Sequence, residues 1–147
     1  MRRSPTYKKG EMTMAKVADY IIMRDTSADI GPNLETGAAG ERTFTVDLPD
    51  DIVLTNFQQS PVLMFVVRTP GGSVNVEVDV NGQRITDLAG LNAPIVQTIH
   101  DVIDRTLLRA GIKNDFVFRV VSAQENAKLR LADVILWFQR EPGAIFE

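Results

Sequence analysis

Ser-Val-Asn-Val-Glu-Val-Asp-Val-Asn-Gly-Gln-Arg-Ile, residues 73–85, is the stretch that decides the fold class. Its valines alternate with polar side chains from Val74 to Val80, and this period of two is typical of a β-strand with one buried face. The Asn81-Gly82 pair that follows readily adopts the positive φ angles of a type I′ turn. The stretch therefore predicts a β-hairpin whose second strand returns through Ile85.

The segments on either side of this hairpin also have the composition of β-strands. Most alternate with the same period or consist of β-branched and aromatic residues, and clusters of Gly, Pro, Asn and Asp separate them. Residues 17–23 fit either a strand or a short helical turn, and Ile21 and Ile22 favour the strand. We expect an all-β, antiparallel β-sandwich, jelly-roll-like, with an extended N-terminal segment. The predicted strands are 17–23, 43–48, 61–68, 74–80, 83–85, 116–120 and 128–139.

One segment has a different spacing. Ile99, Val102, Ile103 and Leu107 recur at intervals of three and four residues, which is the repeat expected for one face of a helix. Gly111 is suited to the left-handed conformation that ends a helix. The sequence therefore predicts one short helix in an otherwise all-β chain.

The length of 147 residues predicts one domain with its own core. Residues 1–16 carry a basic cluster without hydrophobic periodicity, so we expect a flexible N-terminal tail, followed by a single β-sandwich domain over residues 17–147. Met14 is an alternative start, since the preceding Lys9-Gly10-Glu11 can be encoded by a purine-rich sequence that resembles a ribosome-binding site.

The composition limits the partners and the location. The net charge of −3 argues against a nucleic-acid binder, which needs a basic surface to displace counterions from phosphates. The longest apolar run, residues 62–67, is far too short to span a bilayer, and no stretch near the start has the length of a signal peptide. We expect a soluble protein without a Sec signal or membrane contact, either cytoplasmic or assembled into a particle.

Catalytic and metal sites have little support in the sequence. His100 is the one histidine and no cysteine is present, so a zinc site lacks ligands. His100 lies beside Asp101 at the predicted helix start, and no serine stands in a Gly-x-Ser-x-Gly motif. We expect neither catalysis nor a cofactor, and a hydrolase based on His100 or an acidic pair is the weakest hypothesis. A structural calcium ion stays open, with carboxylate ligands among Asp25, Asp29, Asp50 and Asp51.

Four segments over residues 74–138 follow each other in a recognisable order: Val76 to Gly82, Leu107 to Gly111 with Asn114, Phe116 to Val120, and Leu131 to Leu136. This order of features resembles the jelly rolls of galactose-binding-like domains and carbohydrate-binding modules. In that superfamily such segments build the sandwich and not the ligand site, so the resemblance implies the fold alone. Trp137, Tyr7 and Tyr20 are the only Trp or Tyr side chains for stacking on a sugar, which weakens the case for a glycan ligand.

Two stretches within the predicted strands are apolar at every position, namely 62–67 and 134–138. A sandwich buries one face of each strand, so a second apolar face has to be covered by another part of the chain, a second copy or a ligand. Trp137 is interpreted as a core or interface residue, with a sugar platform as the alternative. The candidate ligand or interface residues are Trp137, Ile135, Met64, Arg119 and Tyr20.

These observations favour a non-catalytic binding or assembly subunit. The leading hypothesis is a self-associating structural component of a homo-oligomer or a phage-like particle. The alternative is a stand-alone glycan-binding domain similar to a lectin or a carbohydrate-binding module.

Overall fold

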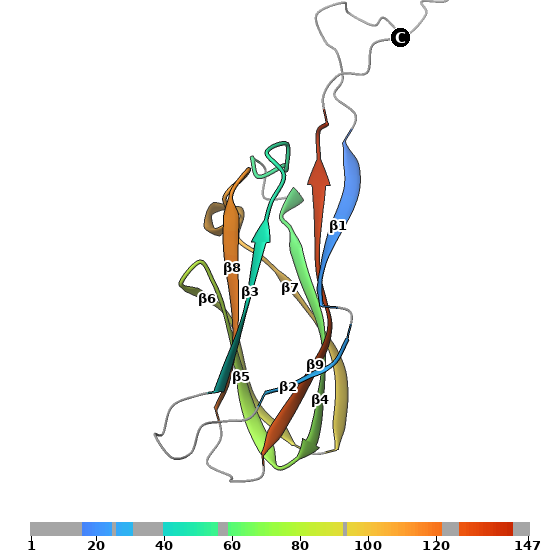
Figure 1. Cartoon of the computed structure of the whole chain (residues 1–147), viewed down its shortest axis with the longest axis vertical. Helices are drawn as coiled ribbons and strands as arrows, with labels where there is room; N and C mark the ends of the chain where they lie inside the picture. Colours follow the sequence, from blue (N-terminus) through green and yellow to red (C-terminus); the bar gives the residue numbers. More distant parts are fainter. Residues whose placement is uncertain are drawn as a thin grey trace, which may run out of the picture.

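The computed structural model describes residues 16–24, 26–30, 40–55, 59–92, 94–121 and 127–142. The expected tail and the Met14 start site lie outside these residues, apart from Lys16. Within the described ranges, nine strands form two antiparallel sheets that face each other (Figure 1). The strands are β1 (Val17–Arg24), β2 (Ala28–Ile30), β3 (Gly40–Asp47), β4 (Val62–Gly71), β5 (Ser73–Val80), β6 (Gln83–Asn92), β7 (Ile95–Val102), β8 (Lys113–Val121) and β9 (Lys128–Arg140).

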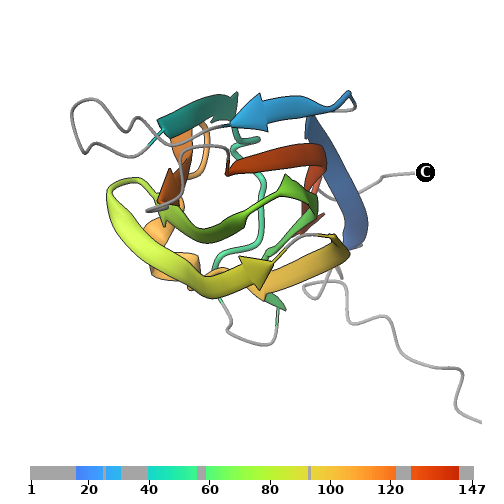
Figure 2. The same ribbon diagram turned by 90° about the horizontal axis from the view of Figure 1, so that it is seen from below.

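The strand order defines a jelly roll. Sheet A has the order β1-β9-β4-β7, with β2 paired to β9 beside β1, and sheet B has the order β3-β8-β5-β6. If β1 and β2 count as two parts of one strand, each sheet has four strands, and the chain crosses between the sheets at every connection except the β5–β6 hairpin. Seen along the strands, the two sheets enclose a single core (Figure 2). The predicted all-β sandwich is confirmed.

Alternating side chains from both sheets fill this core. Val74, Val76, Val78 and Val80 are all buried, as their alternation predicts. Phe118 lies at the centre, with its ring edge-on to both Phe44 and Phe65 at centroid distances of 5.6 and 5.1 Å. The other fully buried large side chains are Leu63, Phe65, Val67, Ile103, Phe116, Leu129, Leu131 and Leu136.

The hairpin prediction is confirmed in detail. Asn81 and Gly82 join β5 to β6 with φ angles of 48° and 84°. The Asn81 amide also donates to the carbonyl of Leu107 at 2.7 Å and to the side chain of buried Asn114 at 2.8 Å. Asn114 in turn bonds the backbone of Arg109, so the turn and the loop between β7 and β8 support each other.

The helix prediction is wrong for most of its range. Residues up to Val102 belong to β7, and only Arg105–Leu107 form a 3₁₀ turn. Ile99 and Ile103 are both buried. Their spacing of four residues fits one face of a helix, but it fits extended backbone equally well, because strand positions separated by an even number share a face. His100 is therefore an exposed residue of a strand and not the start of a helix. Asp104 caps the 3₁₀ turn by accepting from the backbone N–H of Thr106 at 2.9 Å.

A β-bulge changes the alternation halfway along β9. Met64 pairs with Ile135 and Val66 pairs with Ala132, so Asp133 and Val134 both lie opposite Phe65. Asp133 has a φ of 49°. The extra residue lets odd-numbered positions face the core before the bulge and even-numbered positions after it. As a result, one strand of 13 residues keeps its apolar side inside over its whole length.

Candidate interaction site

Sheet A carries an apolar outer surface, which we call the apolar face: Tyr20, Ile22, Val62, Met64, Val102, Ile135 and Trp137. The strand register aligns these side chains in two rows, because residues paired across neighbouring strands share one side of a sheet. The first row is Tyr20, Trp137, Val62 and Val102, and the second is Ile22, Ile135, Met64 and His100.

Much of the apolar face is exposed in the described part of the chain. The exposed fraction is 50% for Tyr20 and Ile22, 41% for Trp137 and 69% for Val102. The side chains between them on β4 and β9 are half-buried, since they are shielded by their neighbours in the sheet. Large apolar side chains are therefore contiguous over four strands, unlike the scattered apolar residues of an ordinary surface.

Tyr20 and Trp137 are the largest side chains of this face. Their ring centroids are 5.0 Å apart, and the ring planes are tilted by 43°. They come from β1 and β9, which are paired neighbours although they are far apart in the sequence. The two rings form one rigid aromatic surface, which is the type of group that contributes most to protein interfaces.

A shallow hollow of about 200 Å³ lies next to Trp137, at the end of the sandwich where β1 begins and β9 ends. Its apolar wall is formed by Val62, Phe138 and the indole ring. Asp19 is the one charged residue in its lining. The remaining lining residues are Ala18, Gln59, Ser60 and Gln139.

Ion pairs stand at this same end, beyond the apolar face. Arg140 donates to both carboxylate oxygens of Asp51 at 2.8 and 2.9 Å and to Asp19 at 3.1 Å. The pKa of Asp19 is lowered by the backbone N–H of Tyr20 and by Arg140, and that of Asp51 is lowered mainly by Arg140. Lys16 pairs with Glu141 at 3.6 Å. Both carboxylates of the Arg140 cluster are thus ionised at neutral pH.

The opposite end of sheet A is basic. Arg68 and Arg130 are directly paired in the register of β4 and β9, and Lys128 is exposed at the start of β9. The Asp29 carboxylate accepts from Arg130 at 2.8 Å, and this hydrogen bond lowers its pKa. Three basic side chains thus stand against one carboxylate, which gives this end of the sheet a surplus of positive charge. The direct pairing of Arg68 with Arg130 is unfavourable, because like charges lie opposite each other.

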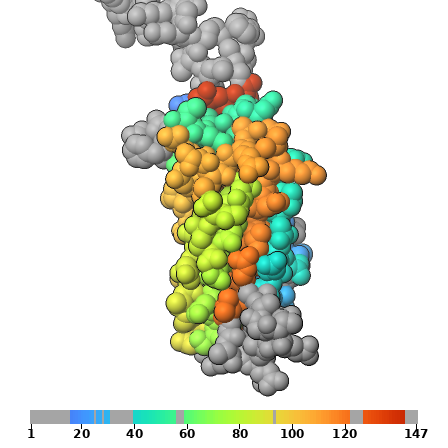
Figure 3. All heavy atoms as spheres, turned by 90° about the vertical axis from the view of Figure 1, so that its left-hand side faces the viewer, coloured from blue at the N-terminus to red at the C-terminus, as the bar shows by residue number. Residues whose placement is uncertain are grey.

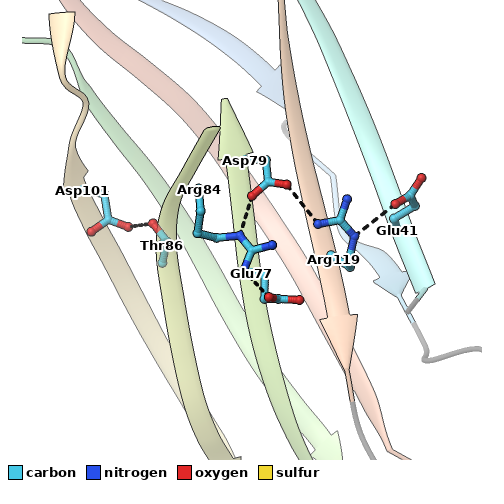
Figure 4. Close-up of polar contacts among 7 residues, drawn as sticks. All are labelled: Glu41, Glu77, Asp79, Arg84, Thr86, Asp101 and Arg119. Carbon is cyan, nitrogen blue, oxygen red and sulfur yellow. Dashed lines mark hydrogen bonds and ion pairs between the residues drawn. The ribbon is translucent and has the colours of Figure 1, made fainter. Parts of the chain in front are cut away.

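Figure 3 shows the side of the molecule formed by sheet B. The outer face of this sheet differs from the apolar face in its side chains. Five charged side chains form an ionic ladder over β3, β8, β5 and β6, shown in Figure 4: Glu41, Arg119, Asp79, Arg84 and Glu77. Arg119 lies 3.0 Å from Asp79 and 3.2 Å from Glu41, and Arg84 bonds both Asp79 and Glu77. Burial raises the pKa of Asp79, but the hydrogen bonds from Arg84 and Arg119 outweigh it and lower the pKa overall.

One polar contact joins the two sheets. The hydroxyl of Thr86, on β6, donates to the carboxylate of Asp101, on β7 (Figure 4). Asp101 points to the inner side of sheet A, because its register partner is the buried Leu63. The hydrogen bond therefore closes the sandwich at the edge where β6 and β7 meet.

The structure brings together four of the five predicted site residues. Trp137, Ile135, Met64 and Tyr20 are all in the two rows of the apolar face. Arg119 is on sheet B, within the ionic ladder, because alternation does not reveal to which sheet a strand belongs. Sequence reasoning missed Ile22 and Val102 as members of the face. For Ile22 the available signal was its alternation with Tyr20.

The proposed calcium ligands are dispersed. Asp29 pairs with Arg130, Asp51 pairs with Arg140, and Asp50 contacts neither of them in any described interaction. Asp25 lies outside the described residues. Within the described ranges, no group of three or more His, Asp or Glu side chains is arranged to hold a metal ion.

No family model matches the chain, and no curated protein matches it. Solved structures of similar shape include the carbohydrate-binding module CBM36 in complex with calcium and xylotriose, with a TM-score of 0.42, 12% identity, and coverage of 85% of this chain and 98% of that one. The structure of infectious bursal disease virus, strain Gx, has a TM-score of 0.49 and 14% identity, with coverage of 88% of this chain and 33% of that one. The structure of dimeric latent PorU from Porphyromonas gingivalis has a TM-score of 0.50 and 10% identity, with coverage of 86% of this chain and 13% of that one.

At these identities the similarity concerns the fold alone. The jelly-roll resemblance expected from the sequence is confirmed at that level. This chain spans about a third of the virus chain and 13% of PorU. In the described residues, no helix is long and apolar enough to span a membrane. The function therefore has to be argued from the surfaces of the molecule.

Proposed function

We propose that this chain is a non-catalytic assembly domain without a cofactor, a structural component of a homo-oligomer or of a phage-like particle. The apolar face is the self-association surface, with Trp137, Tyr20, Ile135 and Met64 at its centre. The observation that carries the proposal is the alignment of one apolar row over four strands and of a second over three of them, all on the outer side of sheet A.

The contrast between the two outer faces supports this choice. A soluble monomer limits contiguous exposed apolar area, and a cluster of Trp, Tyr, Ile and Met resembles the centre of a protein interface. The outer face of sheet B has paired charges at the corresponding positions and is suited to solvent. A net charge of −3 and the paired arginines also give little basis for nucleic-acid binding.

The test is the solution mass by light scattering over a concentration series. We expect a mass above 16.3 kDa that rises with concentration. Trp137→Ser and Val102→Ser should raise the dissociation constant at least about tenfold, which corresponds to roughly 1.4 kcal/mol. Val121→Ser is the matched control, since Val121 is an exposed valine on the outer side of sheet B. A strict monomer at all concentrations would reject the proposal.

A second candidate function is glycan binding at the hollow beside Trp137. The hollow is lined by Trp137 and by the polar residues Asp19, Gln59 and Gln139. Aromatic rings stack on the apolar faces of sugars, while carboxylates and amides bond their hydroxyls. A glycan array with the wild type and Trp137→Ala tests this function. If no glycan binds, or if the variant binds equally well, the candidate is rejected.

A further inference from the structure

We infer that two copies of this chain pack their apolar faces together with their strands running in opposite directions. This inference rests on the proposed function and adds the geometry of the interface. It follows from the uneven distribution of charge along sheet A, where the apolar rows lie nearer to the end at which β1 begins.

Two symmetric arrangements bring the apolar faces of two copies into contact. A two-fold axis parallel to the strands places equivalent ends on each other. A two-fold axis across the strands, in the plane of the interface, reverses one copy, so that each end meets the opposite end of its partner. Both arrangements bury the same apolar residues, and charge distinguishes between them.

The basic end makes the parallel arrangement unfavourable. Among the described residues of this end, Arg68, Lys128 and Arg130 provide three positive charges against the one carboxylate of Asp29, so the sum is about +2. Parallel packing would set two such ends against each other at close range. Like charges in a partly desolvated interface repel strongly and exclude wrong arrangements.

The opposite end has no such surplus of positive charge. Lys16 and Glu141 pair with each other and sum to zero. Asp19, Asp51 and Arg140 sum to about −1, and Asp19 points to the inner side of sheet A, because its register partner is the buried Phe138. When one copy is reversed and the Trp137 row of each copy lies on the Ile135 row of the other, this end overlaps the pair Arg68 and Arg130. The alignment that buries the apolar rows is thus also the one that keeps the two basic ends apart.

The N-terminal segment of the same chain is a poorer occupant of the face. Residues 1–15 contain four Arg or Lys residues and one Glu, a net charge of +3. A segment with this charge would be repelled by the basic end of sheet A. A second copy presents an apolar surface of the same size and an end without a surplus of positive charge, so it fits better.

Site-specific cross-linking tests the direction of packing, because the chain has no cysteine of its own. Both substitutions lie on β9. Gln139→Cys places a thiol beside the Trp137 row, on the side toward the start of β1, and Ala132→Cys places one beside the Ile135 row, on the side toward the basic end. In the opposed arrangement the two positions face each other across the interface. Two copies of the same position lie about 20 Å apart, given about 3.3 Å per residue along a strand.

The experiment treats each variant alone and an equal mixture of both with a short bismaleimide, after light scattering has shown that their mass equals that of the wild type. We expect at least about five times more cross-linked dimer in the mixture than in either variant alone. Efficient cross-linking of Gln139→Cys alone would establish the parallel arrangement and overturn the inference, while the proposed function would stand.

Two other outcomes also contradict the inference. A dimer that gives no cross-link in any combination would mean that the copies meet through another surface. A wild-type monomer that dimerises when residues 1–15 are removed would mean that this segment covers the face. A monomer in both forms would instead reject the proposed function itself, so the two failures are distinguishable.

Discussion

The outer faces of the two sheets differ although the sheets share one core and one type of strand. On sheet A, the positions that point away from the core carry Tyr20, Ile22, Ile135 and Trp137. On sheet B, acids and bases pair with each other along the ionic ladder. The comparison shows that the shared core explains why the inner faces of both sheets are apolar. The core does not explain why the outer face of sheet A is apolar, whereas the proposed partner would.

This difference also predicts which side chains stabilise the fold and which mediate self-association. The inner side chains and the ionic ladder have their partners within the described residues of a single copy, so their removal should change the free energy of unfolding. The exposed side chains of the apolar face have few such partners, so their removal should change association instead. Four substitutions test this division, in order of their expected effect on the free energy of unfolding.

The largest effect is expected from Phe118→Ala. Phe118 is fully buried between both sheets and contacts Phe44 and Phe65 edge-on. Its truncation leaves a cavity in the shared core and should cost about 3–5 kcal/mol. Urea unfolding followed by tryptophan fluorescence measures the loss. A loss below about 1 kcal/mol would mean that the two sheets do not depend on a common core.

The next effect is expected from Thr86→Val, which removes the hydrogen bond between the sheets. Asp101 would lose its donor at a half-buried position, and we expect a cost of about 1–2 kcal/mol. Thr43→Val, at an exposed position of β3, is the control and should change the midpoint of urea unfolding very little. Equal midpoints for the two variants would show that the edge of the sandwich does not need this bond.

Asp79→Asn should cost about 1 kcal/mol at pH 7, because it removes the carboxylate shared by Arg84 and Arg119. The pKa of Asp79 is lowered in the folded state, so its contribution is complete above about pH 4, near the unfolded pKa. It is lost as the pH falls through the lower folded pKa. The stability difference between wild type and variant should therefore be constant above about pH 4 and shrink as the pH falls below it.

The pH series needs a control with the same chemistry. Asp47→Asn serves this purpose, since Asp47 is exposed on β3 and is not part of the ladder. Its difference from the wild type should be small at every pH. If Asp79→Asn shows a difference that does not depend on pH, the charges of the ladder contribute nothing to the free energy of unfolding. The contrast between the two outer faces would then have no electrostatic basis.

The smallest effect on unfolding is expected from Ile135→Thr, below about 0.5 kcal/mol when measured on the monomer at low concentration. The same variant should weaken self-association, measured by sedimentation velocity, because it puts a hydroxyl into the centre of the apolar face. Val117→Thr is matched to it, as a half-buried β-branched residue on the outer side of sheet B. Equal association of both variants would remove the distinction between the faces.

Much of the inner architecture is predictable from the sequence because burial on one face imposes a period of two. Residues 74–80 and the Asn81-Gly82 turn are predicted correctly on this basis. The error at β7 has a physical cause. β7 lies at the edge of sheet A and has polar residues on both faces, so Ile99, Val102 and Ile103 give the spacing of a helix by coincidence.

The candidate site is predictable only in part. Doubly apolar strands predict that Met64, Ile135 and Trp137 leave an apolar surface, and the strand register places the three side chains next to each other. Which strand lies beside which is a property of long-range pairing, and no local pattern contains it. This is why Val102 was missed and why Arg119 was grouped with residues of the other sheet.

The pairing of Val17 with Arg140 has a consequence for how the chain folds. It joins strands that are separated by almost the whole described sequence, and such distant contacts slow folding because a large loop has to close first. A circular permutant that connects β9 to β1 and opens the chain at the exposed turn around Gly72 would make this pairing local. It should reach the same native structure and fold faster than the natural order of strands.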